Sequence, residues 1–233
     1  MPEALAEGGR LGLRVVPGCE FSVSAPWGEM HVLGYFLPVD RPELEDFLTG
    51  CRAMRVRRAE EMVSRLQAAG QSVTMGDVLT EAGCGAVGRP HVARALLRTG
   101  GVRGMDEAFQ RFIGRGRVAY VPKVLPSFAE VCQLVHRAGG LVSTAHLRDR
   151  GTRSSLKAFK AQGLDGVETR HPGHDPDTRA RLTDLALELG LLRTGGSDWH
   201  GDGLAGETHG PMGSQEVPAD WLVEMEKRLA SPV

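Results

Sequence analysis

The sequence has few aromatic residues, little net charge and no long apolar run. Its 233 residues include two tyrosines and three tryptophans, so an extended surface for stacking nucleobases is not expected. Lysine and arginine together number 28 and aspartate and glutamate 29, and the net charge of -1 gives no sign of a general nucleic-acid or membrane surface. No segment is apolar for long enough to span a bilayer, and we expect no signal peptide and no membrane partner. The length suits one sizeable domain, or a barrel with an insertion.

Cysteine is also scarce, and the cysteines are widely spaced. They form no CxxC pair and lie at Cys19, Cys51, Cys84 and Cys132. We therefore expect buried free thiols and a reducing, cytoplasmic location.

The second half of the sequence carries a repeated pattern of helix, glycine, strand and then a histidine or carboxylate. Three predicted strands end in this way: residues 141–145 at His146, 164–167 at Glu168, and 191–194 at Asp198 and His200. Alternating helices and strands indicate a parallel sheet. Ligand-type side chains at successive strand ends indicate a barrel with its site on that face.

The opening residues are expected to repeat the pattern. A helix over residues 3–8 is followed by a predicted strand over 11–16, which Pro17 and Gly18 interrupt. Extended structure resumes with Glu20 at a turn. Residues 30–35 form a further predicted strand, antiparallel to its predecessor across the turn at 25–28.

Residues 41–119 differ from the rest of the sequence, because their apolar residues have helical periodicity and few segments resemble strands. We interpret them as a helical insertion or cap subdomain within a barrel domain made of residues 1–40 and 120–233. The arginines at 55, 57 and 58 are expected on the solvated face of a helix, with an RNA-backbone contact as the alternative. In the barrel part, Ser127 and Glu130 predict a capping box, and Asp175 before Pro176 predicts another helix start.

Several short motifs, in this order along the chain, resemble those of the PHP (polymerase and histidinol phosphatase) superfamily. They are Pro17–Glu20, His31–Tyr35, Gly88–His91, Tyr120–Lys123, Ala145–His146 and Gly196–Gly201. The resemblance is to the branch of nucleoside 3′,5′-bisphosphate phosphatases and 5′-to-3′ exoribonucleases. It implies an α/β fold, a distorted (β/α)7 TIM-like barrel with a helical insertion, and up to three bound divalent ions, Mn, Fe or Zn.

The resemblance also implies roles for individual residues. Those matching metal ligands are Glu20, His31, His146, Asp198 and His200, of which Asp198 and His200 are also the expected catalytic residues. Those matching contacts to substrate phosphate are Arg89, His91 and Lys123. The chemistry agrees, since neutral imidazoles suit these metals and a guanidinium forms a planar fork for phosphate.

The departures from the family lie mainly at the start of the sequence. The family opens with Asp-Leu-His-x-His-Thr and Thr-Asp-His-Asp motifs, and neither is present here. We therefore expect a barrel lacking its first strands and an impaired activity in this short form. Leu147 also stands where the family usually has proline.

The remaining histidines are assigned no ligand role. Glu168, His171 and His174 are expected in the second shell or facing solvent, and His136 and His209 on the surface. The preferred interpretation is a metal-dependent phosphoesterase acting on phosphorylated small molecules, nucleotides or short RNA, with the oligomeric state left open. Two alternatives are a non-catalytic remnant that binds metal or phosphate, and a metal-dependent hydrolase of the amidohydrolase type. The phosphate-binding set favours phosphate over amide substrates.

Overall fold

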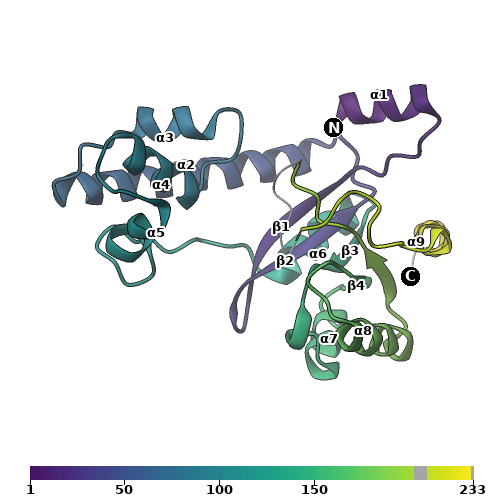
Figure 1. Ribbon diagram of the computed structural model, residues 1–233. Coiled ribbons are helices and arrows are strands. Elements are labelled where there is room, and N and C mark those ends of the chain that lie inside the picture. Colours follow the sequence, from purple (N-terminus) through teal and green to yellow (C-terminus); the bar gives the residue numbers. More distant parts are fainter. Residues whose placement is uncertain (202–208, 232–233) are drawn as a thin grey trace. The chain divides into compact units, whose positions relative to one another are not determined.

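The structure is a computed structural model that describes residues 1–201 and 209–231. It divides into two compact units, one made of Met1–Leu44 with Leu125–Val233 and the other of Glu45–Val124 (Figure 1). The second unit begins and ends within a few residues of the insertion expected over 41–119. Within the described ranges, no helix combines the length and the apolar character that crossing a membrane requires.

The first unit contains a five-stranded sheet whose strands are ordered as they occur in the sequence. The strands are β1 (Gly18–Ala25), β2 (Gly28–Tyr35), β3 (Leu141–Thr144), β4 (Gly166–Arg170) and β5 (Leu192–Gly195). β1, β2 and β3 pair antiparallel, as expected for the first two, and β3, β4 and β5 pair parallel. The described strands thus form a mixed open sheet, and the predicted (β/α)7 barrel is not confirmed.

The first unit also contains helices, several of which pack on the sheet. They are α1 (Pro2–Leu11), α6 (Phe128–Arg137), the 3-10 turn η2 (Arg148–Arg150), α7 (Arg153–Lys160), α8 (Pro176–Leu189) and α9 (Ala219–Ala230). α6 packs on β1 and β3, α8 on β4 and β5, and α9 on β5. All four residues of β3 are buried, as expected for a strand covered on both faces. The predicted capping box of Ser127 and Glu130 and the Asp175 N-cap are both present.

The strand predicted over residues 11–16 is wrong. α1 continues to Leu11 and closes on Gly12, whose φ of 67° is the left-handed conformation that suits glycine. Leu11 and Leu13 are 59% and 65% exposed, so their side chains have no sheet to pack on. Two carboxylates also lie inside strands rather than after them, Glu20 in β1 and Glu168 in β4.

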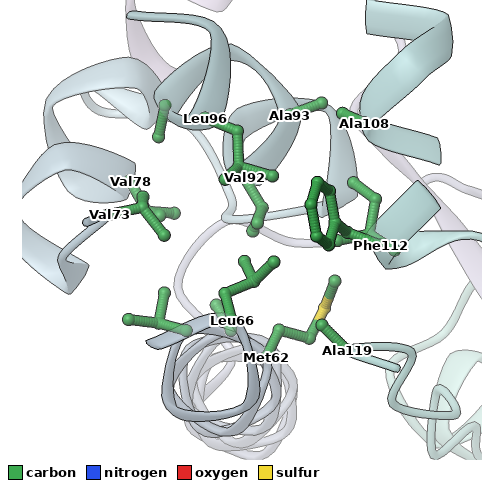
Figure 2. Close-up of a cluster of buried hydrophobic side chains, with 14 of the residues drawn as sticks. Met62, Leu66, Val73, Val78, Val92, Ala93, Leu96, Ala108, Phe112 and Ala119 are labelled. Carbon is green, nitrogen blue, oxygen red and sulfur yellow. The ribbon is translucent and has the colours of Figure 1, made fainter. Parts of the chain in front are cut away.

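The second unit is helical and has its own hydrophobic core. Its elements are α2 (Pro42–Ala68), which begins just before the boundary, α3 (Met75–Ala82), α4 (Arg89–Arg98), α5 (Met105–Ala108) and the π-helical turn η1 (Phe109–Ile113). Figure 2 shows side chains from these helices, Leu66 and Leu96 among them, gathered in one buried cluster. All four cysteines are thiols, but Cys84 is exposed and only Cys132 is fully buried, so the expectation of buried thiols holds in part.

Candidate metal centre

The β1–β2 hairpin brings the first two predicted ligands together. In its register Glu20 pairs with Leu33 and Ser22 pairs with His31, so Glu20 and His31 are diagonal neighbours on one face of the hairpin. Nδ1 of His31 lies 2.9 Å from Oε1 of Glu20. The hairpin therefore presents a carboxylate and an imidazole at one point, even though neither residue follows a parallel strand.

His146 reaches the same point from the end of β3. The backbone N–H of Ala145 donates to the carbonyl of His31, and that of His146 donates to Oε2 of buried Glu168 at 2.7 Å. Nε2 of His146 then lies 3.4 Å from Oε1 of Glu20. His146 has a φ of 32°, an unusual backbone conformation of the kind that clusters at functional sites. We call Glu20, His31 and His146 the hairpin group; their ligand atoms all lie within 4.8 Å of one another.

The electrostatics of the hairpin group keep its carboxylate ionised. Hydrogen bonds from His146 and His31 hold the pKa of Glu20 well below its usual range. The hydrogen bond to Glu20 in turn raises the pKa of His31 to about 9, and Glu29 adds to this. One negative oxygen flanked by two imidazoles is a donor set that fits a divalent cation, because the cation can take the place of the protons between them.

A second group forms in the loop after β5, where the sequence predicts Asp198 and His200. Gly195 permits this loop, since a Cβ there would lie 2.7 Å from Cβ of Arg170. Asp198 has a φ of 49°, in the left-handed region. Nδ1 of His200 lies 3.5 Å from Oδ1 of Asp198, and Nδ1 of His209 lies 2.9 Å from Oδ2. We call Asp198, His200 and His209 the loop group, and its ligand atoms also lie within 4.8 Å of one another.

Two buried histidines lie beside these groups. His171 is 2% exposed; its Nδ1 accepts from Gly173 N–H, and its Nε2, without a hydrogen bond, lies 3.7 Å from Oδ2 of Asp198. Burial lowers the pKa of His171 to about 4, so the ring is neutral near pH 7. The His146 and His171 rings are 5.4 Å apart, so the hairpin and loop groups adjoin. His174 instead has both nitrogens hydrogen-bonded to backbone and holds the turn.

The predicted phosphate contacts lie in the helical unit. Arg89 begins α4, and its guanidinium carbon is 5.7 Å from the Phe109 ring centroid and 6.0 Å from that of Tyr120. Nδ1 of His91 accepts from Gly88 N–H, so this histidine caps its own helix. Lys123 is near Cys51, whose pKa is raised by burial and lowered in smaller part by the positive charges of Arg55 and Lys123. A role of these three residues in binding phosphate stays a prediction.

Sequence reasoning missed the position of His209 and left that of His171 open between two environments. His209 was expected on the surface, and no spacing or motif links it to Asp198, eleven residues away. His171 was expected either behind the metal ligands or in solvent, and the structure has it buried behind Asp198. The position of His171 could be predicted in part from the sequence, because His171 follows an apolar strand and lies within three positions of both Glu168 and His174.

Comparisons with known proteins identify relatives of this chain. No protein-family model matches the chain. The chain is 30% identical over 195 residues to a 5′-3′ exoribonuclease of Haemophilus influenzae, covering 82% of this chain and 71% of that protein. It is 30% identical over 254 residues to a 3′,5′-nucleoside bisphosphate phosphatase of Chromobacterium violaceum, covering the whole chain and 84% of the relative.

A solved structure agrees as well. A crystal structure from Bifidobacterium adolescentis, described as a candidate metal-dependent phosphoesterase, matches with a TM-score of 0.79 and 32% identity, covering 97% of this chain and 81% of that one. The two relatives are named as enzymes that cleave phosphate esters, and the similar solved structure is described as a phosphoesterase. The chain itself has two groups of side chains of the kind that bind metal ions. The chain therefore belongs to the PHP family of metal-dependent phosphoesterases.

Proposed function

We propose that this chain hydrolyses phosphate esters of nucleotides or short RNA, using divalent Mn, Fe or Zn held by the hairpin group. The observation that carries the proposal is the convergence of Glu20, His31 and His146 on one point, with buried His171 between His146 and Asp198. Two nitrogens and one ionised oxygen suit these metals better than they suit Mg or Ca, which prefer all-oxygen sites. When bound, such an ion would act as a Lewis acid that stabilises negative charge on the oxygens of a phosphate ester.

Neighbouring residues of the chain hold the side chains of the site in fixed positions. Glu168 holds the backbone of His146, so the imidazole is fixed with respect to Glu20 before any ligand arrives. Asp198 lies at the adjoining edge, where its carboxylate is held between His171 and His209. A rigid set of donors matters because a displacement near 1 Å can lower a rate about 100-fold.

The substrate class comes from charge and from the relatives. The proteins matched by sequence are named for a nucleoside bisphosphate and for RNA. The predicted phosphate-binding residues Arg89, His91 and Lys123 belong to the helical unit, where Arg89 would offer phosphate a planar fork and Lys123 a point charge. An amide substrate has no use for that charge, so we place amide hydrolysis second, beside a non-catalytic role in binding metal or phosphate.

The test is release of inorganic phosphate from adenosine 3′,5′-bisphosphate in Mn²⁺ by the full chain. We expect slow release, in keeping with the impaired activity expected from the sequence, and this release should stop with a chelator, resume on adding Mn²⁺ and be abolished by Asp198→Asn. A matched control is Asp184→Asn, because Asp184 lies on α8 outside both groups and should leave the rate unchanged. If the chain binds Mn²⁺ but releases no phosphate, the non-catalytic alternative replaces this proposal.

A further inference from the structure

Positive charge is concentrated in the helical unit, although the chain as a whole is nearly neutral. Glu45–Val124 contains 13 lysines and arginines against 8 aspartates and glutamates, a formal charge of +5, so the remainder of the chain carries -6 if the whole carries -1. Like charges repel one another in a compact unit, and an excess of one sign is typical of a surface that meets the opposite sign. The near-zero charge of the whole chain therefore does not exclude a polyanion as a partner of this unit.

Three of these cations form a stripe along α2. From the ordinary rotation and rise of an α-helix, Arg55, Arg58 and Arg65 lie within about 80° of one another around the axis and extend over about 15 Å. All three side chains are partly exposed. The stripe borders the face of α2 that packs Met62 and Leu66 into the core of the unit, so this packing fixes its position.

A second segment of the same unit runs alongside the stripe and is joined to it by hydrogen bonds. Nε of Arg58 donates to the carbonyl of Val121 at 2.9 Å, and Nη1 of Arg65 donates to the carbonyl of Tyr120 at 2.8 Å. Nε of Arg65 also donates to Glu61. A guanidinium has five N–H groups, so these bonds hold it in place and leave it further donors for an anion.

Two more cations extend the stripe at its ends. Arg55 and Lys123 both act on the thiol of Cys51, one turn before Arg55 on α2, so the two charges lie near each other. At the other end, the guanidinium carbon of Arg89 lies 6.0 Å from the ring centroid of Tyr120, whose carbonyl Arg65 holds. We call this set the basic strip; its members are Arg55, Arg58, Arg65, Arg89 and Lys123.

We propose that the basic strip binds successive phosphates of an RNA strand, with the three arginines of α2 extending the contacts predicted at Arg89 and Lys123. The choice of RNA among polyanions rests on the proposed function. A nucleoside bisphosphate presents two phosphates within one nucleotide, whereas the arginines of α2 alone extend over about 15 Å. The strip therefore fits an RNA oligomer better than a single nucleotide. Contacts to phosphate carry no sequence information, so binding should not depend on the bases.

The test measures binding without hydrolysis. A fluorescently labelled, single-stranded oligouridylate is titrated with the full chain in the presence of a chelator, and its anisotropy gives the affinity at several salt concentrations. The logarithm of the affinity should fall linearly with that of the salt concentration, by about 0.7 for each phosphate contact. Arg55→Gln should bind several-fold more weakly at low salt and make this slope about 0.7 less steep. Arg55→Lys keeps the charge and should keep the slope.

Arg57→Gln is the matched control. Arg57 is exposed on the same helix, about 160° around the axis from Arg55, and its removal should leave affinity and slope unchanged. Within the part of the chain that the structure describes, the Arg55 side chain donates no hydrogen bond, so Arg55→Gln should melt at the temperature of the wild type. Arg65→Gln serves as a second variant, with its melting temperature as the check on folding.

Three outcomes would overturn the proposal. Arg55→Gln and Arg65→Gln could both bind RNA with the affinity and slope of the wild type. Arg57→Gln could cause the same loss as Arg55→Gln, which would mean that only net charge matters. Duplex DNA could bind as tightly as RNA with the same dependence on Arg55, which would make the strip a general site for polyanions. RNA binding by a chain that releases no phosphate would instead refute the proposed function and leave this inference standing.

Discussion

At the scale of single residues, the tautomer of His171 is decided by one backbone hydrogen bond. Gly173 N–H donates to Nδ1, so the proton lies on Nε2 and faces Asp198. The two ring nitrogens therefore have separate roles: Nδ1 accepts a hydrogen bond within the turn, and Nε2 presents a proton toward the Asp198 carboxylate. Asparagine and glutamine can each reproduce one of these duties, because their polar atoms lie near Nδ1 and Nε2 respectively.

This separation gives a paired prediction. His171→Gln keeps a donor toward Asp198 and should retain phosphate release within a few-fold of wild type. His171→Asn keeps the acceptor for Gly173 but removes that donor, and should lower kcat about 10-fold to 100-fold with a smaller change in KM. Steady-state kinetics with adenosine 3′,5′-bisphosphate separates the two. Equal loss in both variants would mean that His171 acts only by filling space.

At the scale of elements, helix starts could be predicted from the sequence because they depend on residues three apart. The capping box of Ser127 and Glu130 and the cap at Asp175 are both local, and both are present. The strand predicted over 11–16 is absent from the structure, because an apolar run does not by itself determine whether another strand is available to pair with it. Strand pairing and the loop group depend on contacts between distant segments, which explains why His209 went unrecognised.

The capping box of α6 permits a measurement of its own. Ser127→Ala removes an acceptor for Glu130 N–H and should lower the free energy of unfolding by about 1 kcal/mol. Ser154→Ala, at an exposed position in the first turn of α7, should change it by less than about 0.5 kcal/mol. Urea unfolding followed by circular dichroism checks both. A loss for Ser154→Ala as large as that for Ser127→Ala would contradict the assignment.

A histidine–carboxylate pair joins α6 to the segment before β4 and gives a pH dependence. Nε2 of His136 lies 2.7 Å from Oδ2 of Asp165, which also accepts from Val142 N–H, and this bond raises the pKa of His136 above its ordinary value. The charged pair stabilises the fold fully below the unfolded-state pKa of about 6.5, and this contribution disappears as pH rises through the folded-state pKa.

We therefore expect His136→Gln to be less stable than wild type at pH 5.5 and closer to it at pH 8.5. Thermal unfolding at the two pH values measures this difference between the proteins. A gap that widens toward pH 8.5 would show that the pair contributes nothing through charge.

At the scale of the whole molecule, each compact unit has its own core. Leu96 is fully buried in the cluster of the helical unit (Figure 2). Its neighbour Leu97 is 39% exposed. Leu96→Ala should cost about 2–5 kcal/mol and Leu97→Ala much less. Metal ions should stabilise only the unit that contains Glu20 and Asp198, because binding favours the folded state of the part that binds.

Differential scanning calorimetry can distinguish the units on this basis. We expect Leu96→Ala to lower the transition of the helical unit, and Mn²⁺ to raise the other transition in wild type and variant alike. A single transition that responds in full to both changes would contradict two separately cooperative units.

The left-handed backbone at His146 and Asp198 restricts how this centre can vary in an evolving or engineered sequence. Glycine would relax the backbone but offers no side-chain donor, and glutamate or cysteine would offer a donor at the cost of strain. Histidine, aspartate and asparagine are the donor-bearing residues best tolerated in that conformation. Both positions already hold members of this small set. A library that diversifies the metal ligands should therefore yield working variants at His31, in a regular strand, more often than at His146 or Asp198.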